Sequence, residues 1–239
     1  MNIILFRPAE ADHPLPRQDP RARHLLEVLR RRPGDCFDAG LINGPRGKGT
    51  LVSVDPGHLS LAFTWGESPP PLCPLVLLIG LPRPQTVRDI LREATALGVA
   101  AMHFIRTERG EASYANSTLW LSGAWEDCII AGTAQANCTR LPEVTHGRTL
   151  PETLATLPAG SMRLALDNYE AKVALSAYNT LGGKSAVLAL GAERGWSAAE
   201  RDLLRQSRFT LVHLGERVLR TETACIAAIT LLKAKLGWI

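Results

Sequence analysis

The chain has 239 residues, of which 46% are apolar and 21% charged, a composition typical of globular proteins and not of disordered ones. The net charge of +4 is modest, and no stretch approaches the roughly 18 consecutive apolar residues of a membrane span. Because the start MNIILFRPAE lacks the basic region and cleavage site of a secretion signal, we expect a cytoplasmic protein of one or two domains.

Short apolar runs separated by turn signals occupy the first sixty-odd residues. They predict strands over residues 3–6, 36–39, 50–54 and 59–63, with turns at Pro33-Gly34, at NGPRGKG and at Pro56-Gly57. One helix is expected over residues 20–32, with an apolar stripe on one side and its arginines facing outward. We therefore predict a small β-barrel-like domain over residues 1–68 that carries one basic helix.

Positive charge gathers in this domain, in a basic segment (residues 17–32). Its six arginines face two acidic residues, a local excess equal to the net charge of the whole chain. Such an excess suggests contact with a polyanion, most simply a phosphate backbone, although a solvated helix face explains it equally well. For His24, inside this segment, packing and RNA contact are both open. The arginines are Arg17, Arg21, Arg23, Arg30, Arg31 and Arg32.

The stretch ESPPPLCP marks the clearest domain boundary, because three consecutive prolines continue neither a helix nor a central strand. We place a linker at residues 69–74 and a second domain at residues 75–239.

Strands alternate with helices in this second domain, a pattern that predicts an α/β fold with a mainly parallel sheet. The expected strands are 75–81, 102–107, 162–166, 185–191 and 209–215, and the expected helices are 86–98, 119–136, 197–206 and 223–235, with a further short segment at 154–157. Gly98 is a natural end for the first of these helices, and Ser197 with Glu200 forms a capping box for the third.

Two of the expected strands end in unusual loops, LALGAERGW (188–196) and VHLGERVLRTETA (212–224). Ligands of open α/β sheets bind beyond the carboxyl ends of the strands, and glycines there let the backbone approach a ligand closely. Thr221 is expected to cap the last helix. Glu222, in the first turn of that helix, is either functional or a partner of the helix dipole.

Several well-known sites are not supported. There is no G-x-G-x-x-G after a first strand, no G-x-S-x-G elbow and no H-x-x-x-H spacing. LGGKS (181–185) resembles the end of a phosphate-binding loop, but Tyr178 stands where that loop begins with glycine. Five scattered cysteines without a C-x-x-C pair favour neither zinc nor disulfides, and we interpret them as buried or incidental thiols (Cys36, Cys73, Cys128, Cys138 and Cys225).

Four segments together resemble the ribosomal RNA small subunit methyltransferase E family: RHLLEVLRRRPGD, REATALGVAAMHFIRTERG, LGAERGWSAAE and LGERVLRTETA. The resemblance implies an enzyme that methylates N3 of a uridine in 16S ribosomal RNA with S-adenosyl-L-methionine. It also implies a homodimer, with a PUA-like barrel over residues 1–68 and a SPOUT domain with a deep trefoil knot over residues 75–239.

The same resemblance assigns site residues. The cofactor residues would be Leu166, Leu190, Gly191, Glu193, Gly195, Leu214, Gly215, Val218 and Leu219. Arg220 and Glu222 would line the methyl-transfer centre, with Arg217 beside them: a carboxylate accepts the N3 proton and an arginine stabilises the uracil anion. No metal is expected, since the sulfonium carries its own electrophile. The RNA-binding candidates are Arg21, Arg23, His24, Arg30, Arg83 and Arg140.

The chain departs from the family pattern in three places. The usual G-P-E-G-G loop is GAERG (191–195), E-L-G is ALG (96–98), and E-Q-S-x-R is AQANC (134–138) with Arg140 two places on. Two alternatives therefore stay open: a SPOUT methyltransferase of another RNA nucleotide, and an RNA-binding ribosome-assembly protein without catalysis. The final helix, apolar on most sides, predicts a dimer interface or, alternatively, core packing.

Overall fold

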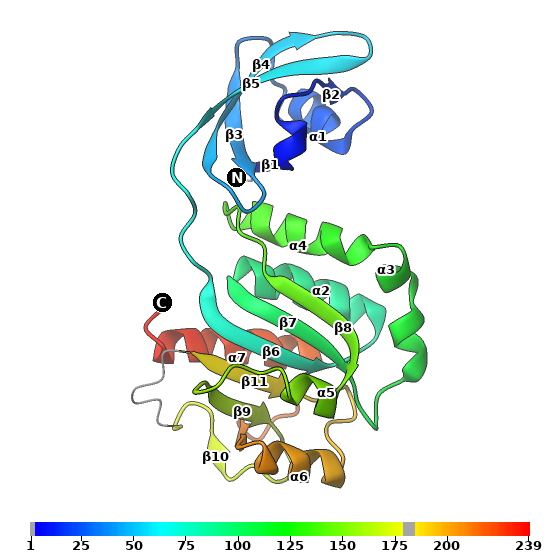
Figure 1. The fold of residues 1–239 in the computed structure, drawn as a ribbon, viewed down its shortest axis with the longest axis vertical. Helices are drawn as coiled ribbons and strands as arrows, with labels where there is room; N and C mark the ends of the chain where they lie inside the picture. The colour runs from blue at the N-terminus through cyan, green and yellow to red at the C-terminus, as the bar shows by residue number, and fades with distance from the viewer. Residues whose placement is uncertain (1–2, 179–184) are drawn as a thin grey trace. The chain divides into compact units, whose positions relative to one another are not determined.

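The computed structural model describes residues 3–178 and 185–239, which form two compact units (Figure 1). The first unit comprises Met1–Pro71 and Thr133–Leu141, and the second comprises Leu72–Gly132 and Pro142–Ile239. The boundary after Pro71 lies inside the expected linker. The return of residues 133–141 to the first unit was not expected from sequence, because it depends on contacts distant in the chain: Thr139 donates to the carbonyl of Gly44 at 2.5 Å.

A five-stranded sheet in the order β1-β3-β4-β5-β2 forms the first unit, and only the β1–β3 pairing is parallel. The four predicted strands are present with shifted ends, and β2 is an additional one. The strands are β1 (Ile4–Phe6), β2 (Leu15–Pro16), β3 (Cys36–Leu41), β4 (Arg46–Val54) and β5 (His58–Trp65). Their core includes the fully buried side chains of Leu25, Leu51 and Leu59.

The basic helix differs from its prediction in two ways. Helix α1 (Pro20–Arg23) continues as a π-helical turn, η2 (His24–Val28), and the chain then leaves the helix, with Arg30 at φ 52°. The positive φ of Arg30 ends the right-handed helix, and Pro33 disfavours helical backbone at Arg32, so the helix does not resume before the turn. Arg21 does not face outward as expected, since its guanidinium pairs with Asp19 and with Glu10 of a preceding 3₁₀ turn, η1 (Pro8–Glu10).

Seven parallel strands form the sheet of the second unit, in the order β10-β12-β9-β11-β6-β7-β8. The five expected strands are present, and β8 and β10 were missed. Strand β8 lies at the sheet edge with few apolar residues, and β10 has only two residues, so neither carries a local signal. The strands are β6 (Cys73–Gly80), β7 (Val99–Arg106), β8 (Glu143–Thr149), β9 (Met162–Leu166), β10 (Val173–Ala174), β11 (Ala186–Leu190) and β12 (Thr210–His213).

The predicted helices are largely present, with three corrections. The helix expected over 119–136 breaks at Ser122-Gly123, where Gly123 has φ +76°. The short segment expected at 154–157 is α5, which begins earlier at a Thr149–Glu152 capping box. Thr221 is the first residue of the last helix and not its cap. The helices are α2 (Pro84–Ala96), η3 (Ala112–Asn116), α3 (Thr118–Leu121), α4 (Ala124–Gln135), α5 (Leu150–Leu154), α6 (Ala198–Gln206) and α7 (Thr221–Lys235).

Helices cover both faces of the parallel sheet (Figure 1). On one face α2 and α7 pack together and contact β7 and β11, and on the other α5 contacts β7 and β8 while α6 contacts β12. Side chains alternate along a strand. Val187 and Ala189 of β11 therefore join the core beneath α5 and α6, which includes the fully buried Trp196. This explains why β11, buried on both sides, is a continuous apolar run.

The order of the central strands brings three loops together. In β9, Leu166 is in register with Leu190 of β11 and with Val212 of β12. Because the three strands are parallel and end at the same level, the loops that follow them leave the sheet side by side.

All five cysteines are free thiols, three of them buried. Burial raises the pKa of the Cys225 thiol to about 12. No helix of the described residues has the length and apolar character needed to cross a membrane. Most of LGGKS lies in residues 179–184, outside the described residues.

Candidate functional site

The loops after β9, β11 and β12 enclose a pocket of about 430 Å³. All nine residues expected to bind the cofactor lie in its lining, so the structure brings together positions up to 53 residues apart. The lining consists of Leu166, Asp167, Asn168, Tyr169, Ala171, Leu190, Gly191, Ala192, Glu193, Arg194, Gly195, His213, Leu214, Gly215, Glu216, Arg217, Val218, Leu219, Thr221 and Ala224.

Two glycines give the pocket its backbone shape. A Cβ on Gly191 would lie 2.9 Å from the backbone of Gly195, so no larger residue fits the tight turn of this loop. Gly215 has φ +110°, a conformation that side chains with a Cβ rarely adopt. These constraints explain why both loops carry glycine directly after the strand.

Glu193 connects the pocket to the start of α2. Its Oε1 accepts a hydrogen bond from the backbone N–H of Arg83 at 2.9 Å, one of the amides at the helix terminus that has no partner within the helix. The carboxylate therefore holds the GAERG loop against α2. The side chain of Arg83 is exposed, and its Nε donates to Thr86 Oγ1 at 3.3 Å.

Sequence reasoning missed the β9 side of the pocket except for Leu166. Asp167, Asn168 and Tyr169 follow it directly, and the buried Asp167 carboxylate pairs with Arg201 of α6 at 2.7 Å. Since Arg201 lies 34 residues further along, no local pattern could reveal the pair. The only available signal was an acidic residue directly after a buried strand.

One of the three catalytic candidates lines this pocket, and the other two are next in the chain to residues that line it. Arg217 belongs to the lining, whereas Arg220 and Glu222 do not; Arg220 is exposed and Glu222 is half-buried in the first turn of α7. Their neighbours Thr221 and Ala224 do line it. Within residues 3–178 and 185–239, none of the three candidate side chains forms a hydrogen bond or ion pair. Among the described residues Arg217 and Arg220 therefore have no side-chain partner, whereas Glu222 lies in the first turn of α7, where a carboxylate also complements the helix dipole.

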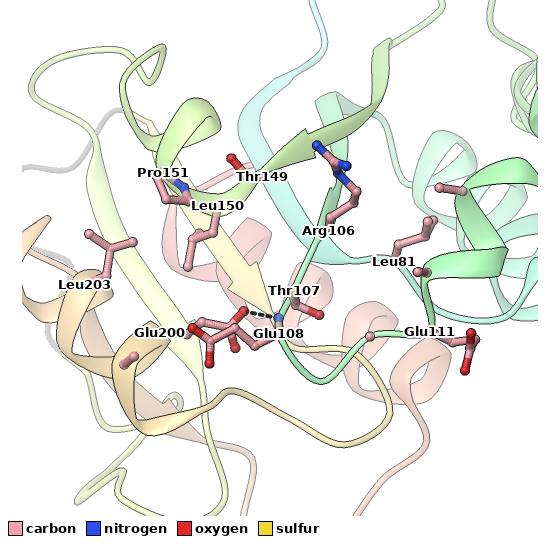
Figure 2. Close-up of a pocket in the computed structure, with 14 residues that line it drawn as sticks. Leu81, Arg106, Thr107, Glu108, Glu111, Thr149, Leu150, Pro151, Glu200 and Leu203 are labelled. Carbon is pink, nitrogen blue, oxygen red and sulfur yellow. Dashed lines mark hydrogen bonds between the residues drawn. The ribbon is translucent and has the colours of Figure 1, made fainter.

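A second pocket of about 520 Å³ lies where β7 and β8 end (Figure 2), and none of its residues was predicted as a site residue. The buried carboxylate of Glu200 accepts hydrogen bonds from the backbone N–H groups of Glu108 and Ser197, both at 2.8 Å. Glu200 thus closes the capping box of α6 and fixes the loop after β7. The lining also includes Leu81, Arg106, Thr107, Glu111, Leu150, Pro151 and Leu203.

The RNA-binding candidates divide by their contacts. Arg23 and Arg30 are exposed and His24 is half-buried. Arg21 instead forms ion pairs with Glu10 and Asp19 at 2.7 and 2.8 Å. Arg140 donates to the carbonyl of Pro69 at 3.1 Å. The guanidiniums of Arg21 and Arg140 are thus engaged within the first unit.

Comparison with known proteins identifies the family. The model of the RNA methyltransferase domain matches residues 68–233. Ribosomal RNA small subunit methyltransferase E of Treponema pallidum is 37% identical, over 95% of this chain and 89% of that protein. Its counterpart E 1 of Borreliella burgdorferi is 30% identical, over 99% of each. The chain belongs to the ribosomal RNA small subunit methyltransferase E family.

Solved structures show that the methyltransferase E fold extends over both units. The enzyme of Neisseria gonorrhoeae, described as bound to S-adenosyl methionine, superposes with a TM-score of 0.80 at 23% identity, covering 97% of each chain. A probable rRNA methyltransferase of Porphyromonas gingivalis superposes with a TM-score of 0.82 at 20% identity, covering 98% of this chain and 99% of that one.

Proposed function

We propose that this protein transfers a methyl group from S-adenosyl-L-methionine to N3 of a uridine in 16S ribosomal RNA, giving 3-methyluridine. The observation that carries the proposal is the pocket after β9, β11 and β12, because it collects all nine residues that family resemblance assigns to the cofactor.

The pocket has the size and chemistry that this cofactor needs. Its volume of about 430 Å³ lies within the usual range for ligand pockets, about 300–1,000 Å³. Leu166, Leu190 and Leu214 offer apolar surface to the adenine ring. The loops at Gly191 and Gly215 bring backbone groups close enough to hydrogen-bond the polar atoms of the ligand.

The charged residues beside the pocket supply the rest of the chemistry. When bound, S-adenosylmethionine offers a methyl group on a positively charged sulfur. Uridine N3 carries a proton at neutral pH and attacks poorly until that proton leaves. We assign Glu222 as the acceptor of the proton. Arg220 stabilises the negative charge that then develops on the uracil oxygens, and Arg217 at the pocket edge assists it.

The finer features of the family are part of the same proposal. We propose a PUA-like barrel for the first unit, a deep trefoil knot for the second, a homodimer and a cytoplasmic site of action on the small ribosomal subunit. The position of β11 between β6 and β9 supports the knot, an exception to the rule that chains do not thread loops. Arg23, Arg30, His24 and Arg83 are the proposed RNA contacts, since Arg21 and Arg140 are engaged elsewhere.

The test compares wild-type protein with Glu222→Gln and Arg220→Ala on small ribosomal subunits from a strain that lacks the gene. Mass spectrometry of nucleosides should show 3-methyluridine with wild type and at least about a 100-fold slower rate with each variant. Calorimetry should show unchanged S-adenosylmethionine binding. Asp202→Asn, exposed on α6, is the control and should methylate normally.

Three results would contradict the proposal. Near-normal turnover by both variants would remove the catalytic assignment. Methylation at another atom or nucleotide would favour a SPOUT enzyme with a different target. If wild type gave no heat with S-adenosylmethionine, the protein would be an RNA-binding assembly factor instead.

A further inference from the structure

We propose that Tyr169 is a cofactor-contacting residue that stacks on the adenine ring, and that Arg201 positions it through the buried carboxylate of Asp167. The inference rests on the proposed function, because it concerns the same pocket. It adds one contact residue and two positioning residues that no family motif assigned.

The loop after β9 is built around the carboxylate of Asp167, which is 5% exposed. Its Oδ1 accepts hydrogen bonds from the backbone N–H groups of Tyr169 at 2.9 Å and Glu170 at 2.6 Å. These two bonds close a tight turn in which the carboxylate replaces a backbone acceptor. The backbone position of Tyr169 therefore depends on where the Asp167 side chain lies.

Arg201 fixes the other oxygen of the same carboxylate. Its Nε donates to Asp167 Oδ2 at 2.7 Å, and the side chains are 6% and 1% exposed. Removing one partner of a buried ion pair strongly destabilises the folded protein, because the remaining buried charge is no longer compensated. Arg201 is held in turn by α6, whose first turn is closed by the Ser197–Glu200 capping box. The position of the turn after β9 thus depends on α6, through the Arg201–Asp167 ion pair.

Tyr169 is an exposed residue of this turn, which Asp167 and Arg201 hold in place. The residue is 76% exposed, although it lines the pocket and carries one of only three tyrosine rings in the chain. The guanidinium of Arg201 lies 5.3 Å from the centre of its ring. The ring edge lies beside the GAERG loop, since a Cβ added at Gly195 would be 3.7 Å from it. An aromatic ring held beside a pocket, between its first two loops, suits a flat heteroaromatic ligand.

The chain offers a matched control one turn further along α6. Arg205 pairs with Glu170 of the same loop and with Asp202, but its side chain is 43% exposed. Exposed ion pairs contribute little, so removal of Arg205 should leave the turn intact. Arg201→Met and Arg205→Met make the same chemical change on the same helix and differ in whether the buried carboxylate loses its partner.

The experiment measures binding of S-adenosylmethionine and of adenosine by calorimetry to wild type, Tyr169→Ala, Tyr169→Phe, Arg201→Met and Arg205→Met. Tyr169→Ala should raise the Kd of both ligands at least about fivefold, as expected when an aromatic ring no longer stacks on a base. Tyr169→Phe should restore binding to within about twofold. Arg201→Met should also raise both Kd values, whereas Arg205→Met should not.

Steady-state kinetics separate positioning from general damage. Arg201→Met should raise the KM for S-adenosylmethionine while leaving the KM for ribosomal subunits unchanged, with kcat at saturating cofactor within about twofold of wild type. A fall in kcat with no change in the cofactor KM would overturn the positioning role. Tyr169 is exposed, so Tyr169→Ala tests the contact even if Arg201→Met fails to fold.

Other outcomes are equally decisive. Wild-type binding of S-adenosylmethionine together with unchanged Kd values for Tyr169→Ala would refute the inference and leave the proposed function intact. If Tyr169→Ala weakened S-adenosylmethionine but not adenosine, the ring would contact the methionine portion, contrary to the inference. A wild-type protein that neither binds the cofactor nor methylates RNA would refute the proposed function itself.

Discussion

The role of Arg21 expected from the sequence differs from the contacts that it makes in the structure. In the sequence it belongs to a basic segment that suggests a polyanion contact. In the structure its guanidinium reaches Glu10, Asp19 and the carbonyl of Leu5, and lies 5.0 Å from the centre of the Phe6 ring. A local charge count cannot reveal this, because the partner Glu10 lies 11 positions earlier in the chain.

These contacts predict a pH-dependent contribution to stability. The hydrogen bond from Arg21 lowers the pKa of Glu10. Burial alone would raise the pKa of Asp19, but the hydrogen bonds and charge of Arg21 outweigh it and lower the pKa. Lowered carboxyl pKa values stabilise the fold above the ordinary values near pH 4, and this stabilisation disappears as the pH falls through the lowered values.

Arg21→Met should therefore destabilise the first unit at pH 7 and lose most of this effect near pH 2. Urea unfolding of wild type and variant at pH 7, 4 and 2 measures the difference. Arg23→Met, exposed on the same helix, is the control and should show no such dependence. A stability difference that stayed constant with pH would contradict the ion-pair explanation.

At the scale of elements, the sequence predicted a helix or strand accurately where residues close together in the chain determine it. The Ser197–Glu200 capping box marked the start of α6, and the predicted range 197–206 agrees with the helix almost to the residue. Strand β8 and the break between α3 and α4 gave no comparable signal. The break lies at Ser122-Gly123, where Gly123 has φ +76°, and an isolated glycine in a helical pattern does not by itself predict an interruption.

Glu200 of α6 offers a test at this scale. Its carboxylate accepts two backbone hydrogen bonds at 5% exposure, so Glu200→Gln places an amide N–H₂ against a buried N–H donor. We expect a loss of about 1–3 kcal/mol of stability. We also expect faster hydrogen exchange at the amide of Glu108 or of Ser197, whichever faces the NH₂ group, detectable by mass spectrometry. Asp202→Asn serves as the exposed control, and unchanged exchange at both amides would contradict the assigned bonds.

At the scale of the whole molecule, the apolar surface of α7 either packs in the core or forms a dimer interface. The helix carries eight apolar residues between positions 224 and 232. Four of them are buried within the chain, so core packing accounts for half of this set: Cys225, Ala228, Ile229 and Leu232. Ala224, Ile226, Ala227 and Leu231 are half-buried. Their spacing of three to four residues places Ala224, Ala227 and Leu231 on one face. This face is the proposed dimer surface.

Sedimentation equilibrium should accordingly give twice the 25.9 kDa mass of one chain. Ala227→Glu should shift the protein toward monomer, because a charge buried in an interface without a partner costs several kcal/mol. Thr230→Glu, exposed on the same helix, should leave the mass unchanged. A wild-type monomer, or equal masses for the three proteins, would exclude this surface as an interface.

The sequence by itself determined the α/β class, the central strands, the capped helix α6 and the two glycine loops, because each depends on residues near one another in the chain. It also determined the family through motifs preserved in order. Only the tertiary structure decided that residues 133–141 join the first unit, that Arg21 is engaged by Glu10, and that Arg201 holds the turn after β9. These features depend on burial and on pairing between distant residues, and neither leaves a periodic trace in the sequence.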